Sequence, residues 1–223
     1  MFFFPHIPKA GGTTLKWLFY ECFGKDNCLK VWDPNFGADI GANQIENFQK
    51  IDFDEVQAVL GHFTVEQFLK IRPLKQRYLD GNVKILATVR DPIDRIISLY
   101  NYVCVYKEHP RHSWMLKQDP IEFIKSKPAN FQFQYLTENK NGDRCLPNGI
   151  EIFSMHDSIL MFKSRLEAFS GEKLEVPALM NQFGDFESDF NFFRKDKISS
   201  EDMELLTEKH RLDLELVQNC VKI

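Results

Sequence analysis

The chain has 223 residues, of which 43% are hydrophobic and 27% are charged, and its formal net charge is -4. This composition is typical of a globular protein with a full hydrophobic core, and we expect one domain over residues 1–223. The acidic balance provides no general basic field, so nucleic acid and anionic membranes are not expected partners.

The first apolar run is too short for a membrane helix, which needs roughly 20 apolar residues. It also lacks the basic residues that begin a signal peptide. The five cysteines form neither a CxxC pair nor a Cys/His spacing that would bind a metal. Irregularly spaced, reduced thiols are typical of cytosolic chains. We therefore expect a cytoplasmic protein, or a trimmed domain of a larger one, with no transmembrane segment and no metal site.

The chain begins with FFFPHIPKAGGTTL, residues 2–15, which has the pattern of a strand, a turn and a helix. Three consecutive phenylalanines predict a short buried strand. Pro5 and Pro8 end its pairing, because proline has no N–H to donate. The apolar residues from Leu15 onward have helical spacing.

The turn in this stretch has the features of an anion-binding loop. Gly11 and Gly12 permit close approach of the backbone, and Thr13 or Thr14 is expected to cap the helix. Backbone N–H groups at such a turn point toward a bound anion. Lys9 adds a positive charge immediately before the glycines, so the loop predicts a phosphate site. An ordinary strand-to-helix turn with a surface lysine is the alternative.

The order of these residues differs from that of the nucleotide-kinase loop. In G-x-x-x-x-G-K-[ST] the lysine follows the glycines, whereas here Lys9 precedes them. No acidic pair follows a predicted strand at Walker B spacing. A P-loop kinase or NTPase therefore fits less well, and it stays open as an alternative together with a non-catalytic nucleotide-binding protein.

A second strand-to-helix junction follows the sequence VKILATV, residues 83–89, which predicts a buried strand. In the following RDPIDRIISLYNY, residues 90–102, Asp91 is expected to cap a helix with proline at its first position. Arg90 stands at the end of the strand and Ser98 lies two turns into the helix. Together they are suited to hold one phosphate, the arginine in bidentate fashion. The alternative is an ordinary junction in which Arg90 pairs with Asp91.

A histidine follows the buried strand predicted at residues 56–60, in the sequence Gly-His-Phe. The carboxyl ends of strands in α/β folds are where ligands bind. His62 is therefore a candidate general base, since its ordinary pKa of ~6.5 lets it accept a proton near neutral pH. A loop histidine with only local hydrogen bonds is the alternative. A helix is expected over residues 64–71, stopped by Pro73.

The rest of the chain has weaker patterns. They predict irregular chain in three places: a loop or lid over 24–43, polar chain over 103–147 and loops over 176–193. They also predict a short helix capped by Asp119, a helix over 156–170 ended by Gly171, and one long helix over 199–220 capped by Ser199. The insert at residues 106–117 mixes basic and aromatic residues. That composition suits an anionic or sugar substrate, although it is more often that of a solvated loop.

The two loop motifs, with the Gly-His-Phe segment between them, resemble the sulfotransferases that use 3′-phosphoadenosine 5′-phosphosulfate (PAPS). The branch they resemble contains heparan sulfate 2-O-sulfotransferase and its bacterial relatives. The resemblance implies an α/β fold with a P-loop-like central parallel sheet flanked by helices. It also implies transfer of a sulfuryl group from PAPS to an acceptor hydroxyl, leaving adenosine 3′,5′-bisphosphate and needing no metal.

The resemblance implies a role for each matching residue. His62 would be the catalytic base, and Lys9 would stabilise charge on the leaving 5′-phosphate. The residues that would bind the cofactor are Lys9, Ala10, Gly11, Gly12, Thr13, Thr14, Arg90 and Ser98. The segment NFQFQYL resembles an N-x-Q-x-x-x-L segment of the same branch, so the weaker candidates for acceptor contacts are Asn130, Gln132, Gln134 and Arg95. Arg95 is equally expected to be structural. The branch points to an acceptor hydroxyl on a glycan or glycolipid and to in-line transfer.

Overall fold

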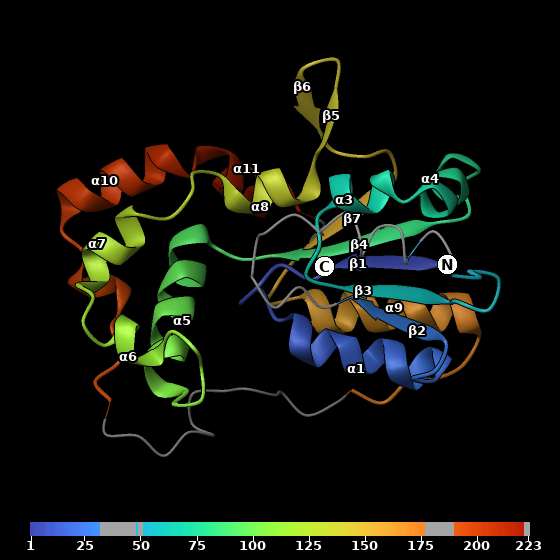
Figure 1. Ribbon diagram of the computed structural model, residues 1–223, viewed down its shortest axis with the longest axis horizontal. Helices are drawn as coiled ribbons and strands as arrows, with labels where there is room; N and C mark the ends of the chain where they lie inside the picture. Colours follow the sequence, from blue (N-terminus) through green and yellow to red (C-terminus); the bar gives the residue numbers. More distant parts are fainter. Residues whose placement is uncertain (32–47, 49–50, 177–189, 221–223) are drawn as a thin grey trace.

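The computed structural model describes residues 1–31, 48, 51–176 and 190–220, and these form an α/β fold (Figure 1). A five-stranded sheet has the order β2-β3-β1-β4-β7, and every neighbouring pair is parallel. The strands are β1 (Phe2–Pro5), β2 (Cys28–Val31), β3 (Ala58–Gly61), β4 (Lys84–Val89) and β7 (Ile150–Ser154). Because β1 lies between β3 and β4, the loops that follow these three strands meet at one edge of the sheet.

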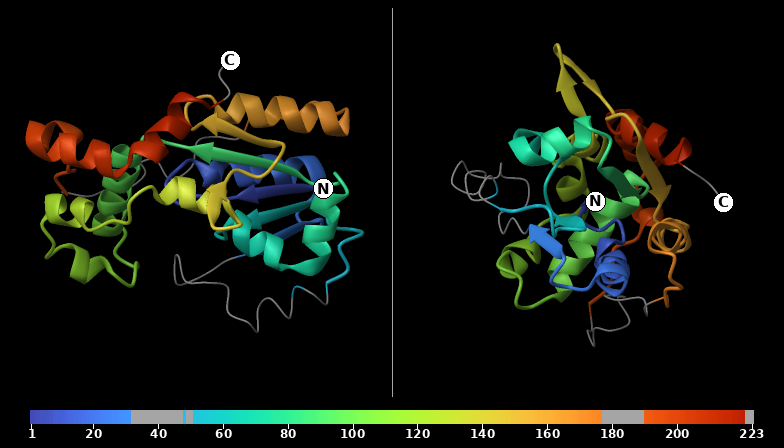
Figure 2. Two further views of the ribbon diagram at one scale, coloured as in Figure 1. Left: turned by 90° about the horizontal axis from the view of Figure 1, so that it is seen from above. Right: turned by 90° about the vertical axis from the view of Figure 1, so that its right-hand side faces the viewer.

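Helices cover both faces of the sheet and extend beyond its carboxyl edge (Figures 1 and 2). Those flanking the sheet are α1 (Gly12–Phe23) and α9 (Ser158–Ser170) on one face, and α3 (Val65–Lys70), α4 (Arg72–Leu79), α8 (Phe131–Leu136) and α11 (Arg211–Gln218) on the other. Those beyond the edge are α5 (Pro92–Val105), α6 (His112–Met115), α7 (Pro120–Lys125), the 3₁₀ turn η2 (Lys195–Lys197) and α10 (Ser200–Lys209). A separate hairpin pairs β5 (Glu138–Lys140) with β6 (Asp143–Cys145).

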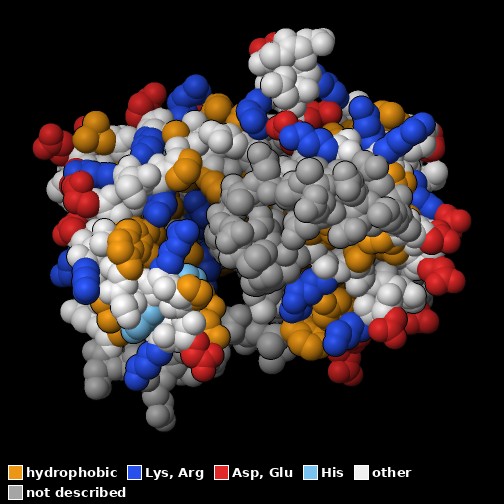
Figure 3. Space-filling view, in the orientation of Figure 1, with side chains coloured by type: hydrophobic (Ala, Val, Ile, Leu, Met, Phe, Trp, Pro, Cys, Tyr) orange, Lys and Arg blue, Asp and Glu red, His pale blue; other side chains and the backbone are white. Residues whose placement is uncertain are grey.

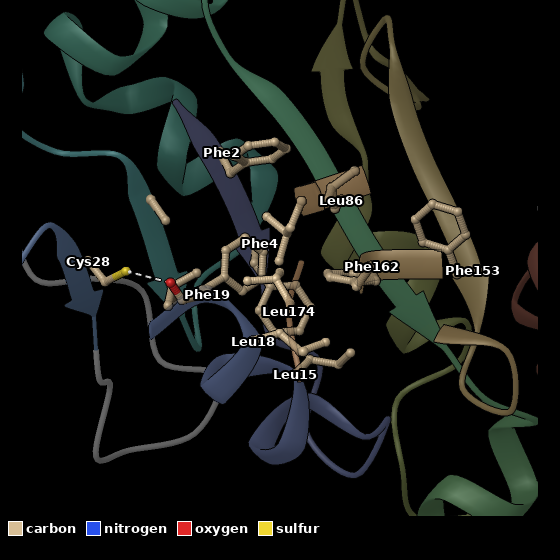
Figure 4. Close-up of a cluster of buried hydrophobic side chains, with 13 residues drawn as sticks. Phe2, Phe4, Leu15, Leu18, Phe19, Cys28, Leu86, Phe153, Phe162 and Leu174 are labelled. Atoms are coloured by element: carbon tan, nitrogen blue, oxygen red, sulfur yellow. Dashed lines mark hydrogen bonds between the residues drawn. The ribbon is translucent and has the colours of Figure 1, made fainter. Parts of the chain in front are cut away.

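The alternation of side chains along β1 builds a core on each face of the sheet, because successive strand residues point to opposite faces. Phe2 and Phe4 pack with side chains of α1 and α9, including Phe19 and Phe162 (Figure 4). Phe3 points to the other face and stacks on Phe68 of α3, with ring centroids 4.1 Å apart. The three aromatic residues thereby fix β1, and the loop after it, at the centre of the molecule.

The sequence predictions for the strongly patterned segments are confirmed. The strands expected near residues 2–4, 56–60 and 83–89 are β1, β3 and β4. Asp91, Asp119 and Ser199 each accept a backbone hydrogen bond at the start of a helix, as predicted. Gly171 ends α9 in the left-handed conformation.

One prediction about helix ends is wrong and another is confirmed. Neither Thr13 nor Thr14 caps α1, which begins at Gly12 after Gly11 in the left-handed conformation and has no side-chain cap. The glycines start the helix earlier than expected, so both threonines lie inside it. The helix expected over residues 64–71 is α3, which ends before Pro73 as predicted, and Pro73 itself lies in the first turn of α4, where no backbone N–H is needed.

Several weakly patterned segments are more ordered than expected. Residues 28–31, predicted as irregular, form the edge strand β2, and 103–147 contains three helices and the hairpin. Strand β7 was not predicted, because its sequence IEIFS is short and lies beside polar turns. The helix expected over 199–220 is two helices that meet at buried His210. Residues 32–43 and most of 176–193 lie outside the described residues.

A membrane-spanning helix is not found in the described ranges, where every helix is too short or too polar for one.

Candidate active site

The loop after β1 is shaped by two residues with positive φ, Lys9 at 67° and Gly11 at 86°. The carbonyl of Ala10 accepts a hydrogen bond of 2.8 Å from the buried Thr88 hydroxyl on β4. Gly12 lies against the His6 ring, and a Cβ at this position would be 2.0 Å from the nearest ring atom. The loop therefore needs glycine at residue 12 to make room for His6.

His62 lies directly after β3 and is joined to this loop through His6. Its Nδ1 is 2.9 Å from the His6 carbonyl oxygen, and the two rings stack with centroids 4.3 Å apart. Because a carbonyl only accepts, Nδ1 donates, and the lone pair of the neutral His62 ring is on Nε2. Burial, followed by the charges of His62 and Lys16, lowers the pKa of His6 well below its usual value.

The residue before His62 has a strict steric requirement. A Cβ on Gly61 would lie 1.8 Å from the Val31 carbonyl oxygen on β2, and backbone atoms of a paired strand have little freedom to move away. The glycine thus lets β2 and β3 stay in register up to the point where His62 leaves the sheet.

Lys9 and Arg90 lie side by side at the ends of β1 and β4. An Arg90 Nη1 donates to the Lys9 carbonyl oxygen at 3.4 Å. The Lys9 ammonium lies 4.0 Å from the ring centroid of Tyr102 on α5. Burial, and then the neighbouring Arg90 charge, lower the pKa of Lys9 to about 8. Two adjacent, partly desolvated cations favour binding of an anion between or beside them.

The charge of Arg90 is partly buried, and its acidic neighbours on α5 and at the start of that helix are paired with another cation. Burial lowers the pKa of its guanidinium, while the charges of Asp94 and Asp91 act in the opposite direction. These carboxylates lie 3.6 Å and 3.1 Å from Lys195 of η2, and no ion pair of 4 Å or less joins them to Arg90 within the described chain. Ser98, two turns into α5, is 6% exposed, and its hydroxyl has no hydrogen-bond partner in the described residues.

The four weaker candidates have contacts within the protein. Arg95 is 3% exposed, and its guanidinium lies 4.6 Å from the Phe131 ring centroid. Gln132 is fully buried and bonded to the main chain of Arg90. Asn130 accepts hydrogen bonds from the start of α11. Gln134 is exposed, and its amide donates to the Ala129 carbonyl oxygen at 2.9 Å.

Sequence reasoning did not single out Tyr102 or Asp213. Tyr102 lies four residues after Ser98, so helical spacing places both on one side of α5, and this signal was available. Asp213 is buried in α11 and accepts backbone hydrogen bonds from α8, more than 70 residues earlier in the chain. Nothing in the local sequence indicates that pairing.

No group of three or more histidine, cysteine or acidic side chains that would hold a metal ion is found in the ranges that the structure describes.

The site is therefore a pair of cationic loops at the carboxyl ends of β1 and β4, with His62 at the end of β3. A family model described as "Sulfotransferase family" matches residues 1–152 of the 223-residue chain, so the protein belongs to the sulfotransferase family. No curated protein matches the chain.

Two solved sulfotransferases are similar in structure. Mouse sulfotransferase SULT7A1, complexed with PAP, is 13% identical with a TM-score of 0.51, over 98% of this chain and 88% of that one. The sulfotransferase from Alicyclobacillus acidocaldarius is 15% identical with a TM-score of 0.43, over 97% of this chain and 93% of that one. The mouse structure supports the fold.

Proposed function

We propose that the protein transfers a sulfuryl group from PAPS to the hydroxyl of an acceptor, with His62 as general base. The observation that carries the proposal is the meeting of Lys9 and Arg90 beside the histidine-bearing end of β3, in a chain of the sulfotransferase family. The mouse sulfotransferase of similar fold was solved with PAP, which supports the same nucleotide here.

The residues at the two loops suit the two phosphates of this nucleotide. Lys9 and the backbone N–H groups of residues 11–14 at the start of α1 would hold the 5′-phosphosulfate. Arg90 and the Ser98 hydroxyl would hold the 3′-phosphate, which ATP lacks. An anion beside Lys9 and Arg90 would offset the burial and, after it, the Arg90 charge, which together lower the pKa of Lys9.

In the proposed step the acceptor oxygen attacks the sulfur in line, and the bond from sulfur to the 5′-phosphate oxygen breaks. His62 takes the hydroxyl proton on Nε2, since its Nδ1–H is donated to the His6 carbonyl oxygen. Lys9 and the loop amides stabilise the negative charge that develops on the departing 5′-phosphate. Most of the catalysis is thus positioning and electrostatics, as in phosphoryl transfer.

Thermal unfolding with adenosine 3′,5′-bisphosphate tests the nucleotide. At a ligand concentration 100 times Kd we expect the melting temperature to rise by about 5–10 °C.

Arg90→Ala should weaken binding by about 100-fold, because a charge-assisted bidentate contact is lost. Exposed Arg72 on α4 provides the control substitution. No shift with the bisphosphate, together with a shift from Mg·ATP, would overturn the proposal in favour of a kinase.

We further propose a carbohydrate acceptor, as in the heparan sulfate 2-O-sulfotransferase branch. Tyr102, next to Lys9, stacks with Tyr106 at 5.5 Å, and His109 lies edge-on to Tyr102 at 6.1 Å. These rings lead from the site toward exposed Lys107 and Arg111. Figure 3 shows Lys, Arg and His side chains mixed with hydrophobic ones over this side of the molecule. Aromatic faces beside cations suit an acidic sugar.

Replacing Tyr106 tests this acceptor surface. We expect Tyr106→Ala to raise the KM for an oligosaccharide acceptor by about tenfold, through loss of ring stacking. Affinity for adenosine 3′,5′-bisphosphate should stay unchanged. Tyr78 of α4, at the amino end of the sheet (Figure 1), is the matched control. An unchanged KM in Tyr106→Ala would contradict the assignment.

A further inference from the structure

The side-chain amide of Gln132 bonds both main-chain polar groups of Arg90. Its Oε1 accepts from the Arg90 N–H at 3.0 Å, and its Nε2 donates to the Arg90 carbonyl oxygen at 2.7 Å. Arg90 lies one residue beyond Val89, the last residue of β4 in register with β7. On the other side, β4 pairs with β1 only at Phe2 and Phe3. Gln132 thus takes the place of a neighbouring strand where β1 and β4 have separated.

Gln132 is itself held in place by α11. Asp213 accepts hydrogen bonds from the backbone N–H groups of Gln132 at 3.2 Å and Phe133 at 2.7 Å, in the first turn of α8. In return, the Asn130 side-chain oxygen accepts from the backbone N–H groups of Leu212 at 2.9 Å and Asp213 at 3.4 Å. The two helices therefore cap each other, and both capping side chains satisfy N–H groups that the helices cannot pair internally.

The surroundings leave this arrangement little freedom. Gln132 and Asp213 are both fully buried, and Arg95 beside them is 3% exposed. The Arg95 guanidinium lies over the Phe131 ring of α8 at 4.6 Å. A buried amide with every partner satisfied is costly to move, because any shift leaves polar groups unpaired in the interior.

We propose that Gln132 is a positioning residue that aims the Arg90 guanidinium at the 3′-phosphate, and that α11 supports it through Asp213. This inference rests on the proposed function, since the 3′-phosphate belongs to PAPS and its product. With the main chain of Arg90 fixed on both sides, the guanidinium lies against the Lys9 loop, where Nη1 contacts the Lys9 carbonyl oxygen. Gln132 therefore sets nucleotide selectivity without touching the nucleotide.

Calorimetric titration with two probes tests the inference. Adenosine 3′,5′-bisphosphate and adenosine 5′-monophosphate differ only in the phosphate that Arg90 would bind. In Gln132→Met, which keeps the side chain's length and removes both hydrogen bonds, we expect affinity for the bisphosphate to fall by about tenfold and affinity for the monophosphate to stay unchanged. Gln76→Met, at an exposed position of α4, should change neither.

The outcomes separate the two proposals. If the unaltered protein binds the two probes equally, the proposed function fails. If it prefers the bisphosphate and Gln132→Met weakens both probes equally, or neither, Gln132 is not a positioning residue. Should Gln132→Met fail to fold, Gln132→Glu keeps the acceptor for the Arg90 N–H and removes only the donor. A smaller preference for the bisphosphate in that variant supports the inference, and an unchanged preference overturns it.

Discussion

His62→Asn should lower the rate of sulfuryl transfer by about 10³-fold while leaving nucleotide affinity within about twofold of the original value, since general bases typically contribute 10²–10⁴-fold. The asparagine amide retains an N–H that can donate to the His6 carbonyl oxygen, as Nδ1 does at 2.9 Å. It lacks a basic nitrogen in place of Nε2. The variant therefore removes the base while keeping the contact that orders the loop.

The measurement is transfer from radiolabelled PAPS to a panel of unsulfated oligosaccharides, with calorimetric titration of adenosine 3′,5′-bisphosphate beside it. His156→Asn is the control, because His156 is exposed in the turn before α9. Transfer at the original rate by His62→Asn would rule out this histidine as the base. A loss of nucleotide binding equal to the loss of rate would assign it to the cofactor site instead.

Lys9→Met should lower the transfer rate by about 10²–10³-fold, the usual effect of removing one group that stabilises charge in a transition state. Its pH dependence is a second signature. The pKa of Lys9 is lowered to about 8, so the ammonium is present below that pH and lost above it. Affinity of the unaltered protein for adenosine 3′,5′-bisphosphate should therefore fall between pH 7 and pH 9, and this fall should disappear in Lys9→Met.

Lys70 provides the control, because it is an exposed lysine of α3 whose partner is Glu66 of the same helix. Lys70→Met should keep both the rate and the fall in affinity with pH. If the affinity of Lys9→Met falls with pH as in the unaltered protein, another group is responsible for the titration and the role given to Lys9 is wrong.

The central part of the fold was predictable because its signals are local. Three phenylalanines, a β-branched run and two capping aspartates each specify a strand or a helix end within a few residues. Strands β2 and β7 were not predictable, because each becomes a strand only by pairing with a neighbour: β2 pairs with β3, and β7 pairs with β4. Such pairing is a property of the folded sheet, and short mixed segments carry little of it in their own composition.

The candidate site, like the fold, was predictable only where its residues lie in short local sequence patterns. Lys9, the glycines and Arg90 lie in two short patterns whose chemistry is visible in sequence, and the structure brings Lys9 and Arg90 into contact. The contacts that Gln132 makes with Arg90 were not predictable from the sequence. A glutamine in a short helix gives no sign that its amide completes the main-chain hydrogen bonds of a residue 42 positions earlier.

The mutual capping of α8 and α11 has a consequence for the newly made chain. The five strands of the sheet are complete once residue 154 has been synthesised, but the carboxylate that holds the start of α8 is at residue 213. Until that residue has left the ribosome, the N–H groups at the start of α8 lack their partner and Gln132 is not fixed. All five strands of the sheet are therefore made well before Gln132 is fixed, so the proposed nucleotide site would be the last part of the molecule to be completed.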